Sequence, residues 1–247
     1  MGHLGYGYGS EFQLLRFMGR HRNLLDDEIK KQINIVGDIK WLDFEFTDLR
    51  NSLIGDKELT GLQFLNLLSF VSNEQIQSIR NEISQFKVGI MISKQSWDAI
   101  FTIADSLYLV EAKAYCEEMN TKDHERSAND NIKSFMQAQL PNVNVSCEWL
   151  RQPYQLANRL ATAALLNRNG VKTKILYLFF ENGYNKRQII DKEIVIIENK
   201  DTQKSDFEDA LNREMTLLGI SRDTIKNLFV TPVYINVLLS DKTTNTI

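Results

Sequence analysis

The sequence predicts a mixed α/β (α+β) protein in which a central mixed sheet is flanked by helices. Of its 247 residues, 43% are hydrophobic and 25% are charged, a composition typical of a globular domain with a full core. Short apolar runs rich in β-branched residues alternate along the chain with segments whose apolar residues recur at helical spacing. We therefore expect one domain over residues 1–247.

Each element is predicted from its own local pattern. Ser10 and Gln13 have the spacing of a capping box, so a helix is expected from Glu11 to about His21. The later segments predict, in chain order, a half-exposed strand at 41–46, two helices between 60 and 86, a strand at 87–93, a hairpin of strands 97–103 and 107–114, a helix at 129–139, a helix at 154–170 with Gly170 as its C-cap, strands at 174–180 and 193–198, a helix at 205–219 and a strand at 229–239.

The chain lacks the signals of a membrane or secreted protein. No apolar run approaches the ~18–20 residues that a membrane span needs, and the first residues lack the basic flank and apolar stretch of a signal peptide. Cys116 and Cys147 are far apart and outside any C-x-x-C unit, which predicts neither a zinc ribbon nor a redox pair. We expect a cytoplasmic protein with reduced cysteines and no membrane partner.

The charge of the chain is unevenly distributed. The net charge is −3, which argues against a protein that coats nucleic acid through a general positive field. Residues 149–190 nevertheless carry seven basic side chains and one acidic one, whereas residues 41–148 carry nine basic and sixteen acidic ones. Contact with nucleic acid is therefore expected to be local.

The expected hairpin places charged side chains where core residues would be usual. If its turn lies between Ala104 and Asp105, Asp98 faces Glu111 across the two strands. Side chains alternate between the faces of a strand, so Lys113 shares the face of Glu111. A register one residue different would separate the two acids.

Two neighbouring carboxylates and a lysine indicate a particular chemistry. The like charges repel, so each carboxyl tends to hold a proton unless a cation lies between them. Mg²⁺ suits such a pair, because it is usually held by one or two carboxylates together with waters and phosphate oxygens. A nearby lysine can stabilise the charge that builds on phosphorus. The pattern therefore predicts phosphodiester hydrolysis.

These residues also carry a resemblance to a known family. Asp98, then twelve residues, then Glu111-Ala112-Lys113 at the end of an apolar strand resembles the signature of the PD-(D/E)XK nucleases, the restriction-endonuclease-like superfamily. The segments GYGSEFQLLRFMGRHR, SWDA, VEAKAY and PYQLANRLA are together similar to a bacterial branch of it. Trp97 stands where the motif usually has proline. The resemblance covers residues 5–25 and 96–182.

The resemblance implies a fold, a cofactor and a set of ligands. It implies an αβββαβ core, with a core helix at 10–22, an insertion at 23–86, a catalytic core at 87–182 and a C-terminal extension at 183–247. It further implies that Asp98, Glu111 and the carbonyl of Ala112 bind Mg²⁺, for which Mn²⁺ substitutes, and that Lys113 is catalytic. The Gln-x-x-x-Tyr motif of one nuclease branch is missing, since Gln152 and Tyr154 are only two residues apart.

Two helices offer further site residues. Glu11 shares a helical stripe with Leu14 and Met18, and an acid on a core-facing stripe is costly unless it is paired or metal-linked. Interaction with the helix dipole is the alternative for Glu11. In the family the core helix often carries a glutamate near the metal, and the later helix often supplies a polar residue to the site. These likenesses favour Glu11 on the core helix, and Gln155 and Arg159 on the later helix, as site residues.

Other polar residues are candidates for contact with nucleic acid. Gln155, Asn158, Arg159 and Thr162 form one polar stripe on the helix at 154–170, for which a solvated face is the alternative. Within it we expect Arg159 and Asn158 to contact nucleic acid. Arg20 and Arg22 are further candidates, with a role as C-terminal partners of the helix dipole as the alternative.

Two functions are carried forward. The first is a metal-dependent nuclease that cuts DNA rather than RNA, since most of the superfamily acts on DNA, with a homodimer left open. The second is a nucleic-acid-binding or assembly module that keeps the fold without cutting. An acid-x-lysine triplet occurs four times in the chain, so the triplet alone does not decide between a site and an ordinary exposed hairpin end.

Overall fold

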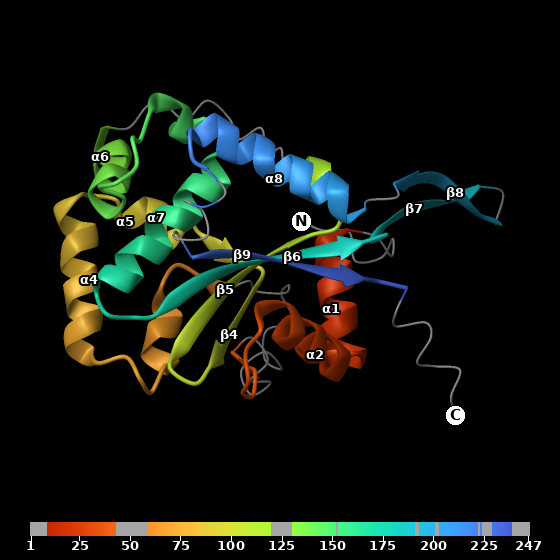
Figure 1. Ribbon diagram of the computed structural model, residues 1–247, viewed down its shortest axis with the longest axis horizontal. Helices are drawn as coiled ribbons and strands as arrows, with labels where there is room; N and C mark the ends of the chain where they lie inside the picture. Colours follow the sequence, from red (N-terminus) through yellow and green to blue (C-terminus); the bar gives the residue numbers. More distant parts are fainter. Residues whose placement is uncertain are drawn as a thin grey trace.

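A computed structural model describes residues 9–42, 59–119, 130–151, 153–190, 193–200, 203–221, 223 and 229–238. Within these ranges a five-stranded mixed sheet in the order β1-β4-β5-β6-β9 forms the centre of the molecule, with helices on both faces (Figure 1). The elements are α1 (Ser10–Arg20), α2 (Arg22–Ile33), β1 (Lys40–Trp41), β2 (Leu59–Thr60), α4 (Asn73–Gln85), α5 (Gly89–Ser93), β3 (Ser96–Trp97), β4 (Ala99–Ile103), β5 (Ser106–Lys113), α6 (Asp130–Gln139), α7 (Tyr154–Arg168), β6 (Thr173–Glu181), β7 (Tyr184–Ile190), β8 (Glu193–Lys200), α8 (Lys204–Leu218) and β9 (Val230–Asn236), with 3₁₀ turns at Gln63–Leu67, Cys116–Glu118 and Cys147–Leu150.

The hairpin has the register expected from the sequence. Strand β4 pairs antiparallel with β5, from Ala99 opposite Val110 to Ile103 opposite Ser106. Strand β5 then pairs parallel with β6, which places Glu111 beside Tyr177 and Lys113 beside Phe179. The sheet is completed by β9, parallel to β6, and by β1, antiparallel to β4.

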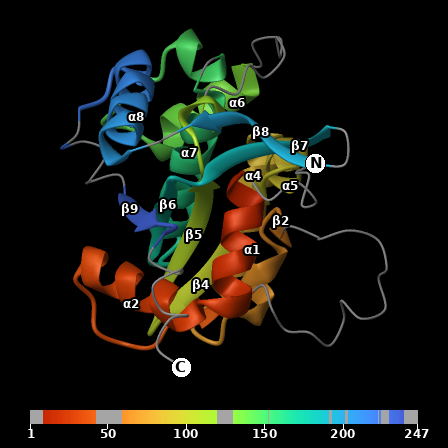
Figure 2. The ribbon, with the colours of Figure 1, turned by 90° about the vertical axis from the view of Figure 1, so that its right-hand side faces the viewer.

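The alternation of side chains on the central strands divides the core into two layers. Tyr108, Val110 and Ala112 of β5 face α1 and α2, and α1 lies along β5 in Figure 2. Leu107 and Leu109 point to the opposite face, which α7 and α8 cover. Glu111 and Lys113 share that second face, so the expected alternation is confirmed and the charged residues lie beneath helices.

The prediction of a strand at 87–93 is wrong, because residues 89–93 form the short helix α5. Val88, Met91 and Ile92 are buried while Gly89 and Ile90 are exposed, which is the spacing of one helical face. A short apolar run with β-branched residues fits a strand or a helix, and packing decides between them. The sheet position beside β4, which the αβββαβ order assigns to this segment, is taken by β1.

Other N-terminal expectations are met in part. The strand expected at 41–46 is represented by β1, and residues 43–46 lie outside the described ranges. In place of the first helix expected after residue 60, the chain forms β2 and a 3₁₀ turn, whereas the second helix is α4. The first residues of the expected hairpin strand form β3, which pairs with β2 instead of β5.

The capping box expected at the start of α1 is also wrong. The helix begins one residue earlier, with Gly9 at its N-cap and without a side-chain cap from its own sequence. Gln13 donates from Nε2 to the carbonyl of Gly183 at 3.1 Å, so its side chain is used for a distant loop.

Most of the elements predicted after residue 129 are confirmed, and they contribute to the core. Helices α6, α7 and α8 and strands β6 and β9 match their expected ranges, and Gly170 follows α7 with a φ of 79°. Strand β8 pairs with β7 in a separate two-stranded ribbon that extends from the body in Figure 1. Strand β9 extends the central sheet, so residues assigned to an extension complete the fold.

No helix in the described ranges is both long enough and apolar enough to cross a membrane.

Candidate active site

Glu111 is the centre of a buried polar cluster at the end of β5. Its side chain is only 2% exposed, and both carboxylate oxygens are engaged. Oε1 accepts hydrogen bonds from Nζ of Lys113 at 2.8 Å and from Nε2 of Gln155 at 2.5 Å. Oε2 accepts from Nε of Arg159 at 3.0 Å. One carboxylate is thus held from its own strand and from α7.

Helix α7 presents a buried polar stripe instead of a solvated one. Asn158 and Arg159 are each 6% exposed and Thr162 is fully buried. Arg159 donates from its second guanidinium arm to the carbonyl of Ser96, and its guanidinium lies over the Trp97 ring, 4.3 Å from the centroid. Trp97 is fixed by a hydrogen bond from Nε1 to the carbonyl of Gly61. Trp97 therefore supports the arginine that holds Glu111.

Asp98 occupies the single position between β3 and β4, beside Glu111. Its Oδ2 accepts a hydrogen bond of 2.6 Å from the amide of Ala112, and the side chain is half-buried. The amide and carbonyl of one strand residue point to the same side of the strand, so this bond also places the Asp98 carboxylate on the side to which the Ala112 carbonyl points.

The charges of this cluster are balanced by the protein's own cations. Burial by itself raises the pKa of Glu111, but the charges and hydrogen bonds of Lys113 and Arg159 bring that pKa below its ordinary value. Burial by itself lowers the pKa of Lys113, but the charges of Glu111, Asp98 and Glu118 bring it above its ordinary value. A carboxyl here is expected to lose its proton when a cation is close, and for Glu111 the two buried cations Lys113 and Arg159 take that part.

Glu118 is a further acidic neighbour of the site. Its Oε2 accepts a hydrogen bond of 2.6 Å from the amide of Ala114, directly after Lys113. Its Oε1 accepts from the amide and the hydroxyl of Ser10, at 3.1 and 3.0 Å. One side chain thus connects the end of β5 with the start of α1 and replaces the expected local cap.

Glu214 on α8 is a second carboxyl that sequence reasoning missed. It is buried, and burial raises its pKa to about 8, with the charge of Lys113 opposing this increase and that of Glu111 adding to it. The available signal was its spacing, because Glu214 lies seven residues after Phe207 and four before Leu218 on the buried stripe of α8.

Glu11 and Asn158, two of the expected site residues, are not part of the hydrogen-bonded cluster around Glu111 in the described ranges. Glu11 is half-buried in the first turn of α1, and across the described ranges no hydrogen bond or ion pair joins it to Asp98, Glu111 or Lys113. Asn158 accepts a hydrogen bond of 2.6 Å from buried Gln95, so its assignment to nucleic acid is corrected to a core contact.

The arginines at the end of α1 are likewise distant from the site. Arg22 donates from Nε to the carbonyl of Met18 at 3.1 Å, which is the helix-capping alternative, and Arg20 is exposed in the last turn. Arg20 lies about 15 Å along α1 from the end that Glu118 holds, given the rise per residue of a helix. Arg22 is the first residue of α2.

The basic block at 149–190 does not form a free positive surface where its side chains are described. Arg159 is buried, and Arg151 pairs with Glu148 at 3.2 Å. Lys172 pairs with Asp105 at the hairpin turn, 2.5 Å apart. Assigning Arg159 to phosphate contact is therefore corrected, because its guanidinium is already bound to protein groups.

The oxygen ligands at the site suit a hard cation held in part by water and substrate. Within the described ranges, no three acidic, histidine or cysteine side chains gather closely enough to form a complete metal site. Asp98 and Glu111 offer two carboxylates, and the carbonyl of Ala112 follows Glu111 directly in sequence. Mg²⁺ is commonly bound by one or two carboxylates with waters and phosphate oxygens, so these residues fit it. Oε1 of Glu111 accepts from both Lys113 and Gln155, so a cation that binds this oxygen takes the place of one of these two donors.

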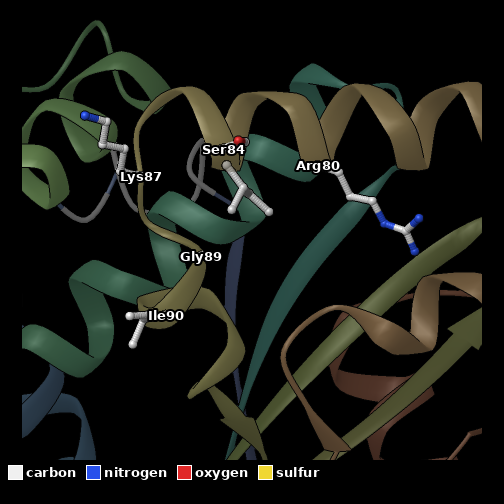
Figure 3. Close-up of a pocket in the computed structure, with 6 residues that line it drawn as sticks. Arg80, Ser84, Lys87, Gly89 and Ile90 are labelled. Carbon is white, nitrogen blue, oxygen red and sulfur yellow. The ribbon is translucent and has the colours of Figure 1, made fainter.

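A surface hollow at the junction of α4 and α5 is a weaker candidate. Its lining residues are Arg80, Ile83, Ser84, Lys87, Gly89 and Ile90, none of which belongs to the Glu111 cluster. In Figure 3 the side chains of Arg80 and Lys87 point away from each other. Because these cations do not converge, the hollow offers no shaped site for an anion.

No protein-family model, curated protein or solved structure matches this chain.

Proposed function

We propose that this protein is a metal-dependent nuclease that hydrolyses phosphodiester bonds of DNA at Asp98, Glu111 and Lys113. The observation that carries the proposal is the hairpin register. It places Asp98, which precedes β4, next to the Glu111-Ala112-Lys113 unit at the end of β5. The resemblance to the restriction-endonuclease-like superfamily supports it, as does a mixed sheet with a helix before the hairpin and the α7–β6 unit after it.

The side chains have distinct roles in this proposal. Asp98, Glu111 and the Ala112 carbonyl hold Mg²⁺, which supplies Lewis-acid polarisation of the scissile phosphate. Lys113, once released from Glu111, offers an ammonium that stabilises the charge growing on the phosphate oxygens. Gln155 and Arg159 orient the Glu111 carboxylate from α7, and Arg159 is itself held by Ser96 and Trp97.

A cleavage assay over several substrates tests the proposal. Purified protein is incubated with Mg²⁺ or Mn²⁺ and with supercoiled, linear and single-stranded DNA or with RNA. We expect metal-dependent cutting of DNA that Asp98→Asn abolishes, because asparagine keeps the size of the side chain and removes its charge. If the protein cuts only RNA, its substrate is RNA and not DNA. If Asp98→Asn cuts as well as the wild type, Asp98 is not part of the site.

One observation favours the second candidate, a module that binds nucleic acid without cutting. Glu111 is buried by its partners, and in the described ranges its carboxylate is held by two ion pairs and one hydrogen bond, from Lys113, Arg159 and Gln155. Such a cluster can serve the fold alone. Tight binding of DNA by the wild type, without cleavage of any substrate in the assay, would select this candidate.

A further inference from the structure

Helix α8 carries one acid on its buried stripe. The other members of this stripe are Phe207, Ala210, Leu211, Met215 and Leu218. Glu214 is only 6% exposed, and its Oε2 is buried without a hydrogen-bond partner in the part of the chain that is described. A buried oxygen of this kind is costly, so its presence calls for a function.

The position of α8 directs this acid toward the Glu111 cluster. Phe207 stacks on Phe179 of β6 with ring centroids 4.5 Å apart, and Phe179 is the register partner of Lys113. At the other end of the helix, Trp149 donates from Nε1 to the carbonyl of Leu218 at 2.9 Å. Glu214 lies between these two attachments, on the face that covers β6.

The electrostatics of the neighbourhood agree with this placement. The charges that act on Glu214 are those of Lys113 and Glu111, beyond the effect of burial. Tyr177, beside Glu111 in the sheet, has a pKa raised by burial and then by the charge of Glu214. Groups on β5, β6 and α8 therefore share one buried environment.

Cation binding at Glu111 creates a need for another acceptor. Lys113 is 6% exposed and donates to Oε1 of Glu111, the oxygen that also accepts from Gln155. A buried ammonium that loses its partner is strongly unfavourable. Asp98 is itself an expected ligand, and both oxygens of Glu118 already accept from backbone or hydroxyl groups. Oε2 of Glu214 remains as an acceptor.

We propose that Glu214 is a positioning residue that receives the Lys113 ammonium when Glu111 turns to a divalent cation. This role rests on the proposed nuclease function, because it presumes a cation at Asp98 and Glu111. It assigns a part in the site to α8, a helix outside the sequence segments that resemble the nuclease family.

A double-mutant cycle on cation affinity tests the role without measuring cleavage. Mn²⁺ binding is measured by calorimetry for the wild type, Glu214→Gln, Lys113→Ala and the double variant. We expect Glu214→Gln to weaken Mn²⁺ binding about ten- to hundredfold, because Glu214 gives up its proton when it receives the ammonium and glutamine cannot form this charge-assisted hydrogen bond. In the Lys113→Ala background the same substitution should change nothing, because no ammonium needs a new acceptor.

Asp209→Asn is the matched control, because Asp209 lies on the exposed face of the same helix. It should bind Mn²⁺ like the wild type. An equal loss from Glu214→Gln in both Lys113 backgrounds would overturn the role, since Glu214 would then act without Lys113. An unchanged affinity in the wild-type background would overturn it as well. If the wild type binds no Mn²⁺, the proposed metal site is wrong, and the role of Glu214 is wrong with it.

Discussion

Arg159 binds Glu111 while its guanidinium rests on the Trp97 ring, so it serves the fold as much as the site. Replacing it with alanine leaves a buried carboxylate with one cation fewer. We expect Arg159→Ala to lower the free energy of unfolding by about 3–5 kcal/mol, measured by urea denaturation. Arg151→Ala removes an arginine from an exposed ion pair and should cost less than about 1 kcal/mol. Equal costs for the two variants would contradict the buried pairing.

Glu214 predicts a distinct dependence of stability on pH. Its pKa in the folded protein is about 8, against an ordinary value of 4.5, so between these values the folded state holds a proton that the unfolded state has released. The contribution of Glu214 to stability is therefore highest below pH 4.5 and falls as pH rises toward 8. Glu214→Gln has no such proton. We expect the variant to gain stability relative to the wild type across this window and to level off above it, as measured by urea denaturation at pH 5, 6.5 and 8.

Asp209→Asn provides the comparison for this pH series. Its stability relative to the wild type should stay level across the same window. A level difference for Glu214→Gln would show that Glu214 titrates like an exposed acid.

At the scale of elements, Glu118 connects β5 to α1. It accepts from the amides of Ala114 and Ser10 and from the Ser10 hydroxyl. We expect Glu118→Ala to cost about 1–3 kcal/mol of stability, because buried amide donors lose their acceptor. Hydrogen exchange should become faster at Ser10 and Ala114, while the exposed neighbour Glu117 can be changed to alanine without this effect. Unchanged exchange at both amides would contradict the connection.

The sequence predicts the hairpin well because one local rule governs it. Alternation of side chains and the turn at Ala104–Asp105 together set the register, and any slip would turn the whole apolar face of β5 away from α1. Helix α5 is the opposite case. Its apolar run is too short for the spacing of its residues to distinguish a helix from a strand. Tertiary packing against its neighbours decided the outcome.

The site could be predicted only as far as its strand residues and the helix that covers them. Asp98, Glu111 and Lys113 follow from spacing and Gln155 from the resemblance, and the structure brings the four together. The contact of Glu118 with Ser10 could not be predicted, because the two residues are 108 positions apart in sequence. The polar stripe of α7 was taken for a ligand surface, because spacing alone does not tell a solvated face from one that pairs with a buried acid.

For the whole molecule, the C-terminal third is part of one cooperative core. Strand β9 pairs with β6 over seven residues, and α8 packs on β6 through Phe207. We expect a chain that ends at residue 202 to lose the cooperative thermal transition, because the face of β6 and one edge of the sheet become exposed. A transition like that of the full chain would contradict this account of the core.

The ribbon of β7 and β8 offers the matched deletion. Asn182 and Gln203 are joined by a hydrogen bond of 3.0 Å between their side chains, so a short Gly-Ser linker can replace residues 184–202. The ribbon forms its own two-stranded sheet, and its removal should leave the melting temperature nearly unchanged. A collapse of stability would show that the ribbon supports the core.

The most direct test of the nuclease account is the rate at which Lys113→Ala nicks supercoiled DNA, measured together with its affinity for Mn²⁺. The ligands Asp98 and Glu111 survive in this variant, and Glu111 loses a competing cation, so Mn²⁺ should bind at least as well as to the wild type. The nicking rate should nevertheless fall by about 10²–10⁴, the usual effect of losing a positioned acid–base or charge-stabilising group. Arginine should rescue poorly, because its guanidinium is bulkier than the ammonium. Nicking by Lys113→Ala at the wild-type rate, or a wild type that cuts no DNA, would contradict the account.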